Sequence, residues 1–334
     1  MTTLQDKHKT LLEPLRDALY NFENTTVLTE LNKVLAPNVL VQLSFPLETM
    51  QGARSFFETA YAPLHKAIPD LERRETIVVA GHSEDKSHWV GFCGYYTGSF
   101  ESSWLDIPPT GHQISMRFHE FYRIENNLVV EIQALWDIPE VMMQANAWPM
   151  VPSLGREWHV PAPATQDGVN IQDAHLAAKS VKLVEDMCNS LSEYATGGVE
   201  AMALDKYWHP KCSWYGPSGI GTGRGIKGFR NWHQIPFLNG MPNRVGDVEK
   251  GYLFGEGNYV GFTAWPGMKM TISNDGWLGI APANQQITMR SLDFWRCENG
   301  LLRENWVLID LLHVYHQLNV DVLGRMKDFN KARY

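Results

Sequence analysis

Residues 104–144 read WLDIPPTGHQISMRFHEFYRIENNLVVEIQALWDIPEVMMQ, and residues 277–317 read WLGIAPANQQITMRSLDFWRCENGLLRENWVLIDLLHVYHQ. The two segments align without a gap at an offset of 173 residues, and 18 of the 41 aligned positions are identical. Upstream, the same offset pairs Pro37 with Pro210, Gly52 with Gly225, Phe56 with Phe229, Pro63 with Pro236 and Pro69 with Pro242. A register kept over about a hundred residues indicates two tandem copies of one domain.

The length of 334 residues agrees with two domains of ordinary size. Residues 146–171 separate the copies and contain four prolines and few periodic apolar positions, which is typical of an extended linker. We therefore expect a first domain at 1–145, a linker at 146–171 and a second domain at 172–334. Trp148 and Trp158 in the linker indicate that it packs across one of the domains.

Each copy begins with helical apolar spacing, at about 4–35 and 173–207. A short strand, a glycine and a second helical segment follow, and from about residues 72 and 245 the pattern alternates with period two, as strands do. The clearest hairpin joins 113–124 to 128–138 through Asn126 and Asn127. Helices followed by a mainly antiparallel sheet predict an α+β fold. A strongly curved sheet that closes on the helices as a cone would account for the abundant aromatic residues.

Charge and composition limit the classes of molecule that we expect the protein to bind. The net charge is −8, and no run of Lys or Arg occurs, which argues against nucleic acid and anionic membranes and favours a hydrophobic small molecule. The N-terminal segment lacks the apolar core of a signal peptide, and no run of 18 apolar residues occurs, so we expect a cytoplasmic protein. The four cysteines are scattered and the histidines dispersed, so we expect no metal site and no disulfide.

The segment GRGIKG at 223–228 matches the glycine pattern of dinucleotide-binding loops and precedes a helical segment. The first copy has only Gly52 at this place, and no alternation of strands and helices or ribose-binding acid follows at the expected distance. The sequence therefore predicts no dinucleotide cofactor.

The order of motifs in both copies resembles one known family. In the second copy these motifs are Met289-Arg290, Phe294-Trp295-Arg296, Glu298-Asn299-Gly300, Glu304, Trp306, Asp310 and His316-Gln317-Leu318. They are similar to the SnoaL-like polyketide cyclases, whose cone-shaped fold is shared with scytalone dehydratase, ketosteroid isomerase and nuclear transport factor 2. The resemblance covers the whole chain except the linker. It implies an enzyme without metal or organic cofactor that closes a polyketide ring by aldol condensation.

The resemblance also implies that a pocket aspartate acts as acid and base, and it places this role on Asp310 and, in the first copy, on Asp137. Strand alternation puts Asp310 on one face with Trp306, and Asp137 on one face with Gln133, so desolvation could raise the pKa of either carboxyl group. The alternative is helix capping. Asp137 is followed three residues later by Glu140, as in a capping box, whereas Asp310 is followed by His313, so the sequence favours capping more strongly for Asp137.

Glu120 and Asp293 are equivalent acids on the preceding strand. If their face lines the cone, each pocket holds a second acid; if not, they are surface or interface charges, and we favour the latter. The residues expected to contact a substrate are Trp306, His233, Trp232, Trp214, Tyr215, Gln133 and Trp136.

The sequence thus predicts an acid/base enzyme for cyclisation, isomerisation or hydration/dehydration of a hydrophobic carbonyl compound. A non-catalytic binding or scaffold protein of the same fold is the alternative. Because single-domain relatives commonly dimerise, we expect the two copies to pair within the chain as a pseudo-dimer, with further homo-oligomers open.

Overall fold

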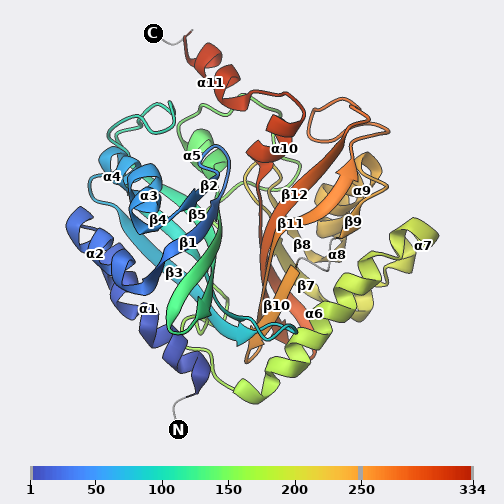
Figure 1. Ribbon diagram of the computed structural model, residues 1–334. Helices are drawn as coiled ribbons and strands as arrows, with labels where there is room; N and C mark the ends of the chain where they lie inside the picture. The colour runs from blue at the N-terminus through green and yellow to red at the C-terminus, as the bar shows by residue number, and fades with distance from the viewer. Residues whose placement is uncertain (1–2, 247–250, 332–334) are drawn as a thin grey trace. The chain divides into compact units, whose positions relative to one another are not determined.

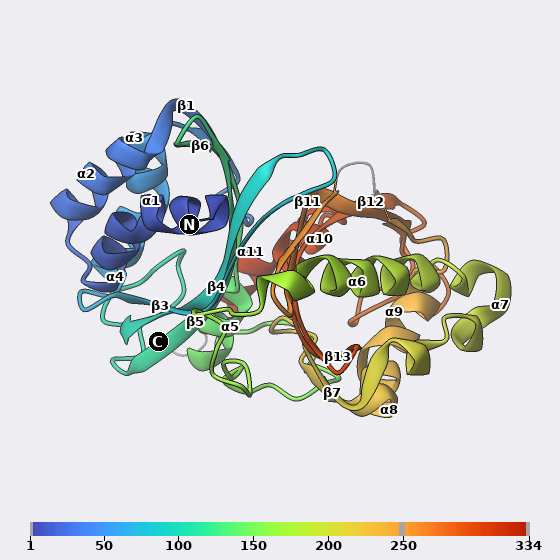
Figure 2. The same ribbon diagram turned by 90° about the horizontal axis from the view of Figure 1, so that it is seen from below.

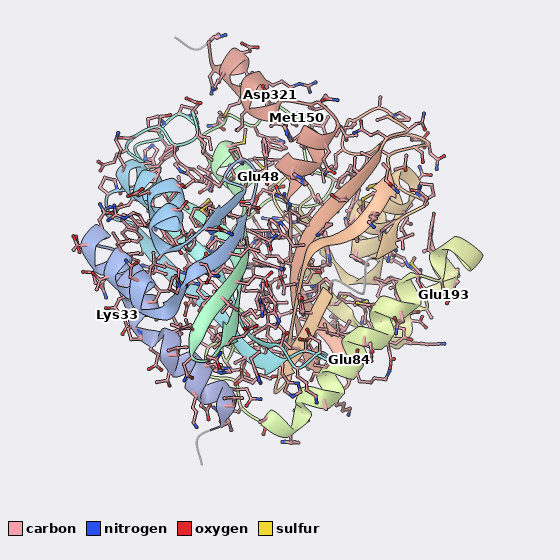
Figure 3. All side chains as sticks on the ribbon, in the orientation of Figure 1. Lys33, Glu48, Glu84, Met150, Glu193 and Asp321 are labelled. Atoms are coloured by element: carbon pink, nitrogen blue, oxygen red, sulfur yellow. The ribbon has the colours of Figure 1, made fainter. Side chains whose placement is uncertain are left out.

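The computed structural model describes residues 3–246 and 251–331 (Figure 1). The chain divides into two compact units, which we call domain 1 (Met1–Pro149 and Asp321–Tyr334) and domain 2 (Met150–Val320). Figure 3 labels Met150 and Asp321, where the chain passes from one unit to the other. The proline-rich segment therefore belongs to domain 2 from Met150 onward, and residues 321–334 belong to domain 1.

Domain 1 is built from helices and one mixed six-stranded sheet. Its elements are α1 (Leu4–Tyr20), α2 (Asn24–Val34), β1 (Leu35–Leu43), β2 (Thr49–Gln51), α3 (Ala53–Phe56), η1 (Phe57–Tyr61), α4 (Ala62–Ala67), β3 (Glu72–His82), β4 (His88–Ser99), β5 (Gln113–Glu125), β6 (Leu128–Trp136), α5 (Ile138–Gln144) and α11 (Val322–Lys331). The strand order is β2-β1-β6-β5-β4-β3, in which only the β1–β6 pair is parallel. Helices α1–α4 lie on one side of this sheet (Figure 1). We call the sheet face that they cover the interior face.

Domain 2 repeats this architecture. Its elements are η2 (Ala174–Leu176), α6 (Ala177–Leu191), α7 (Tyr194–Ala201), η3 (Leu204–Lys206), β7 (Trp208–Tyr215), β8 (Thr222–Arg224), α8 (Gly225–Phe229), η4 (Arg230–Gln234), α9 (Ile235–Gly240), β9 (Val245–Gly246), β10 (Gly251–Glu256), β11 (Tyr259–Thr271), β12 (Gln286–Glu298), β13 (Leu301–Ile309) and α10 (Leu311–Gln317). The order β10-β11-β12-β13-β7-β8 has one parallel pair, β13–β7, and β9 pairs with β11. Figure 2 shows α6, α8 and α9 on one side of this sheet, its interior face. The predicted α+β fold in two copies is confirmed.

Local sequence explains where these elements begin and end. Thr3 and Asp6 form a reciprocal capping box at the start of α1. Asn126 and Asn127 both have positive φ, which a two-residue hairpin turn requires, and they join β5 to β6 as the sequence predicts. In both copies a single π-helical turn, η1 or η4, interrupts the helix before a proline. Such turns re-aim side chains and are frequent at functional sites.

The glycines of the GRGIKG segment have a structural role. Gly225 has a φ of 66° and lies close to the Pro210 carbonyl, so a Cβ there would be strained, and the equivalent Gly52 has a φ of 83°. A Cβ on Gly223 would meet the backbone of Gly228 at 3.0 Å. These glycines therefore permit close packing of β8 against α8.

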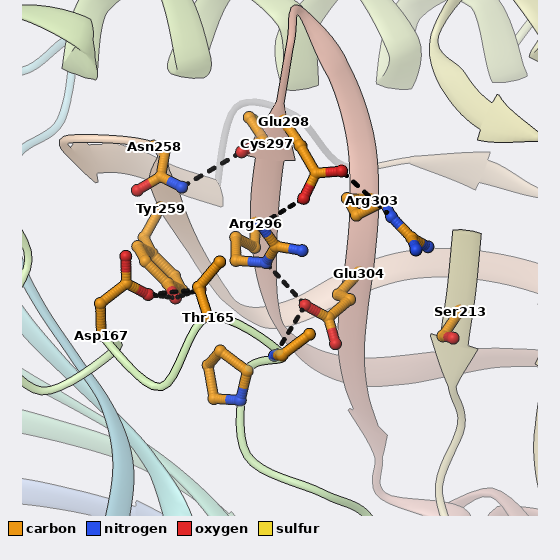
Figure 4. A network of polar contacts seen from close by, with 12 residues as sticks. Thr165, Asp167, Ser213, Asn258, Tyr259, Arg296, Cys297, Glu298, Arg303 and Glu304 are labelled. Carbon is orange, nitrogen blue, oxygen red and sulfur yellow. Dashed lines mark hydrogen bonds and ion pairs between the residues drawn. The ribbon is translucent and has the colours of Figure 1, made fainter. Parts of the chain in front are cut away.

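The linker packs on the sheet of domain 2, against Glu304 and Trp306 on the face opposite the interior. Figure 4 shows Thr165 and Asp167 of the linker beside Arg296 and Glu304 of the sheet. The Ala164 amide donates to Glu304 at 3.2 Å, and the Trp306 indole donates to the Pro161 carbonyl at 3.0 Å. Glu304 also accepts a 2.6 Å hydrogen bond from Arg296. We call residues 150–171 the strap.

Among residues 3–246 and 251–331, none of the helices combines the length and the apolar composition that crossing a membrane requires.

Candidate functional site

The interior face of domain 1 centres on Glu120, whose side chain is completely buried. Its carboxylate accepts four hydrogen bonds: from Tyr96 at 2.8 Å, from Tyr122 and Trp136 at 2.9 Å, and from Arg73 at 3.1 Å. Two phenols, an indole and a guanidinium thus compensate fully for the burial of the charge. The carboxylate of Glu120 is therefore fully bonded within domain 1.

Domain 2 replaces every one of these partners. The 173-residue offset makes Asp293, Trp295 and Ile309 the counterparts of Glu120, Tyr122 and Trp136. Met268 replaces Tyr96, because these residues pair with the equivalent Met289 and Met116, and Gly246 replaces Arg73 by the same reasoning. The acid is conserved between the copies, but the side chains that satisfy it are not.

Asp293 consequently has a different environment from Glu120. Its carboxylate accepts from the Ser291 hydroxyl at 3.3 Å, and its side chain is only partly buried. Burial raises the pKa of Asp293 to about 8, and the Ser291 hydrogen bond opposes this shift. Asp293 is therefore a largely desolvated carboxyl group that keeps some contact with solvent. The sequence interpretation of Glu120 and Asp293 as surface or interface charges is wrong, because both lie on the interior face.

His233 lies in an aromatic cluster on the same side of the sheet. Its imidazole stacks on Trp214 with ring centroids 3.9 Å apart, and the rings of Phe229 and Phe237 lie 5.6 and 5.4 Å away. Burial, followed by the charge of Arg244, lowers the pKa of His233 to about 3, so the ring is neutral at pH 7. Nδ1 is buried without a hydrogen-bond partner in the described part of the chain. A neutral imidazole of this kind can donate or accept a hydrogen bond.

Two further residues of this region, Cys188 on α6 and Arg244 before β9, were not predicted from the sequence. Cys188 is an exposed residue whose thiol lies near Asp293 and Arg244: partial desolvation and the charge of Asp293 raise its pKa, and Arg244 opposes this shift. Arg244 thus acts electrostatically on both Cys188 and His233. We call Cys188, His233, Arg244 and Asp293 the interior cluster of domain 2. A comparison of the copies could have revealed it, because the offset places Ala60 opposite His233 and Leu71 opposite Arg244.

The structure places the two predicted catalytic aspartates elsewhere. Asp310 forms a 2.9 Å ion pair with Arg290 and caps α10 by accepting the His313 amide at 3.1 Å. Asp137 forms a 3.3 Å ion pair with Arg117 and makes no capping hydrogen bond from its side chain. The capping preference drawn from the sequence is therefore reversed. The catalytic role of these aspartates stays a prediction.

Glu140 explains why no capping box forms at Asp137. Its carboxylate accepts the Arg117 amide at 2.6 Å and the Ser115 hydroxyl at 3.2 Å, so it binds β5 instead of the start of its own helix. Burial, followed by the charge of Asp137, raises the pKa of Glu140 to about 8.

The residues predicted to contact a substrate are divided among several places. Trp214 and His233 meet in the aromatic cluster of domain 2. Trp306 and Tyr215 lie on the opposite face of the sheet, beside the strap, with their ring centroids 5.4 Å apart. The side chain of Trp232 is 52% exposed. In domain 1, Trp136 bonds Glu120, and Gln133 donates to Glu131 at 2.8 Å on the other face of β6.

Within the described ranges, no group of three or more His, Cys, Asp or Glu side chains is arranged to hold a metal ion. Cys93, Cys212 and Cys297 are buried free thiols, and Cys188 is an accessible one.

None of the curated proteins compared with this sequence matches it. Among solved structures, AclR from Streptomyces galilaeus, described as "a putative hydroxylase", is 17% identical over 44% of this chain and 86% of its own, with a TM-score of 0.36. IdmH from Streptomyces antibioticus, described as "a putative polyketide cyclase", is 16% identical over 42% of this chain and 99% of its own, with a TM-score of 0.36.

The model of one protein family, the SnoaL-like polyketide cyclases, matches the sequence twice. The matched residues are 13–145 and 195–318, which together make up most of the chain and lie one in each copy. The protein therefore belongs to the SnoaL-like polyketide cyclase family, with two copies of the family's domain in one chain.

Proposed function

We propose that domain 2 catalyses acid/base chemistry on a hydrophobic, carbonyl-containing small molecule, with Asp293 as the group that moves the proton. The reaction is a cyclisation, an isomerisation or a hydration/dehydration. Domain 1 has no catalytic role in this proposal, because its interior acid, Glu120, is held by four hydrogen bonds.

One observation carries the proposal: equivalent acids are fully bonded in one copy and nearly unbonded in the other. Glu120 accepts four hydrogen bonds, whereas Asp293 accepts from Ser291 alone among the described residues. A carboxyl group that is desolvated but not neutralised by a cation is a strong base once ionised. Its raised pKa puts it within reach of neutral pH.

The interior cluster supplies the parts that such a reaction needs. Ionised Asp293 takes a proton from the carbon next to a carbonyl group, and the electrons of the broken C–H bond move onto the carbonyl oxygen as an enolate. The neutral imidazole of His233 can donate a hydrogen bond to that oxygen. Return of the proton to another carbon gives isomerisation. Attack of the enolate carbon on a second carbonyl forms a C–C bond, and Asp293 then returns its proton to the new alkoxide.

The aromatic rings around His233 provide the apolar part of the site. Trp214, Phe229 and Phe237 surround the imidazole, and Trp277 packs on Phe237 with ring centroids 5.6 Å apart. Such a wall favours an apolar, ring-bearing substrate.

The test uses proton transfer itself, since the substrate is not identified. The probe is 2-tetralone, a neutral aromatic ketone whose α-hydrogens exchange with deuterium in D₂O when a base removes them. The full chain should accelerate deuterium uptake, and Asp293→Asn should abolish the acceleration. An Asp293→Asn protein that is folded and as active as the parent protein overturns the assignment.

Two further variants separate this proposal from the prediction made from the sequence. Asp310→Asn breaks the ion pair with Arg290 and should lower stability, while the exchange rate per folded molecule stays unchanged. Glu120→Gln is the matched change in domain 1 and should also leave the rate unchanged. If Asp310→Asn abolishes exchange in a folded protein and Asp293→Asn does not, Asp310 is the acid/base group. If none of these proteins accelerates exchange, the fold serves binding rather than this catalysis.

A further inference from the structure

Arg244 is a guanidinium in the interior cluster that has no carboxylate partner among residues 150–246 and 251–320 of domain 2. In the described part of the chain, no carboxylate forms an ion pair with it, and its polar contact is a 3.3 Å hydrogen bond from Nη2 to the Leu191 carbonyl. Nε is buried without a hydrogen-bond partner in these residues. A desolvated cation without a matching anion is unfavourable, and burial accordingly lowers the pKa of Arg244.

The fold itself does not require an arginine at this position. Its counterpart in domain 1, Leu71, is 2% exposed and belongs to the apolar core. The change from leucine to arginine therefore accompanies the other differences between the copies, namely Ala60 to His233 and the loss of the four donors to the interior acid. All of these differences concern the interior of the cone.

The surroundings of Arg244 indicate what it faces. Its guanidinium carbon lies 5.8 Å from the centroid of the Phe237 ring, which itself lies 5.4 Å from His233. The charge of Arg244 acts on both His233 and Cys188. Arg244 thus adjoins the aromatic wall, and it acts on Cys188, on which Asp293 also acts. The side chain of Arg244 is half-buried, so part of it remains open to a ligand.

We propose that Arg244 binds a carboxylate of the substrate, so that the substrate class is an apolar, ring-bearing carbonyl compound with a free carboxylate. This inference rests on the proposed function, which it deepens. A planar guanidinium with unused N–H groups binds a carboxylate through charge-assisted hydrogen bonds, and the aromatic rings beside it receive the apolar body. The bound anion would also compensate for the burial of Arg244.

The experiment measures binding of two probes of nearly equal shape, 2-naphthoate and its uncharged analogue 2-naphthamide, to the full chain by titration calorimetry. The parent protein should bind the carboxylate at least tenfold more tightly than the amide. Arg244→Met should weaken binding of 2-naphthoate at least tenfold and change binding of 2-naphthamide less than twofold. Arg244→Lys, which keeps the charge but not the planar fork, should lose an intermediate amount.

Arg224→Met is the matched control. Arg224 is an exposed arginine of the same domain whose guanidinium donates to Ser213 at 2.7 Å, and its loss should leave both affinities unchanged. The proposal is overturned if the parent protein binds the two probes equally, if 2-naphthoate does not bind at millimolar concentration, or if folded Arg244→Met and Arg244→Lys keep the full preference. If Arg244→Met does not fold, Arg244→Lys alone decides.

The outcomes distinguish this inference from the proposed function. If the exchange of 2-tetralone depends on Asp293 but the protein shows no preference for the carboxylate, only the role of Arg244 is disproved. If the carboxylate preference depends on Arg244 but no exchange occurs, the binding role of Arg244 is supported and the catalytic role of Asp293 is disproved.

Discussion

Glu120 accepts a 2.8 Å hydrogen bond from the hydroxyl of Tyr96 on the interior face of domain 1, and the same two positions of domain 2 hold Asp293 and Met268. A thioether has no hydrogen to donate, so this bond has no equivalent in the second copy. Both domains thus have an acid at this position, but only domain 1 has the groups that bond it. In the proposed function, the acid of domain 1 stabilises the fold and the acid of domain 2 transfers a proton.

Removal of the Glu120 carboxylate should make domain 1 less stable to unfolding. It should leave the rate of deuterium exchange per folded molecule unchanged. Glu120→Ala leaves Arg73 buried without this counter-ion and three donors without their acceptor, which should lower the free energy of unfolding by about 3–5 kcal/mol. Urea denaturation followed by tryptophan fluorescence measures this loss. A loss below about 1 kcal/mol would show that the network is unimportant for stability.

Neutralising the equivalent acid of domain 2, Asp293, should instead stabilise the protein near pH 8. The folded protein keeps a proton on Asp293 up to a pKa of about 8, whereas an unfolded aspartate releases it near pH 4. The unfolded state therefore binds fewer protons between these values, and the free energy of unfolding falls as the pH rises from about 4 to about 8. Asp293→Asn should remove this loss, which amounts to about 1.4 kcal/mol for each pH unit between the two pKa values, and so stabilise the protein by up to about 5 kcal/mol at pH 8. Urea titrations at pH 5 and pH 8 check it, and equal effects at both would contradict it.

His233 should make the protein sensitive to acid. The folded imidazole stays neutral down to a pKa of about 3, whereas an unfolded histidine takes up a proton near pH 6.5. The free energy of unfolding should therefore fall as the pH drops from about 6.5 to about 3. His233→Phe keeps a ring against Trp214 but cannot titrate, so its stability should depend less on pH in this range. The exposed His112→Asn is the control; an unchanged pH dependence in His233→Phe would refute the prediction.

The attachment of the strap to the sheet of domain 2 should depend on Glu304. This buried carboxylate joins Arg296 of the sheet to the Ala164 amide of the strap and also accepts from the Tyr215 hydroxyl at 3.2 Å. Glu304→Ala leaves Arg296 without this partner and should destabilise domain 2 by about 3 kcal/mol. It should also make residues 150–171 more accessible to protease, which mass spectrometry of the fragments would show. Cleavage at the rate of the parent protein would mean that other contacts hold the strap.

The sequence predicts the architecture well because each element occurs in both copies, so the pattern of one copy can be checked against the other. The hairpin of β5 and β6, the helices and the α+β class were all predicted from periodicity and turn residues, which are local signals. The linker was also expected to pack on a domain, and hydrogen bonds from Ala164 and Trp306 show that it does.

The site was predicted less well, for a physical reason. Alternation along a strand divides residues into two faces but does not say which face the helices will cover, and β5 is buried on both faces over most of its length. Glu120 and Asp293 were therefore assigned to the wrong face. Arg244 and Cys188 come from a loop and a helix far apart in sequence, so no local motif joins them; only the unequal residues of the two copies could have revealed Arg244.

The central claim is that Asp293 is a desolvated carboxyl group poised near neutral pH, and its own titration tests this most directly. Protein labelled with ¹³C at the aspartate side-chain carboxyl carbons should show, by NMR between pH 3 and pH 9, one resonance that titrates near pH 8 and is missing from Asp293→Asn. If the resonance lost in Asp293→Asn titrates near pH 4, like an exposed aspartate, Asp293 is not the acid/base group described here.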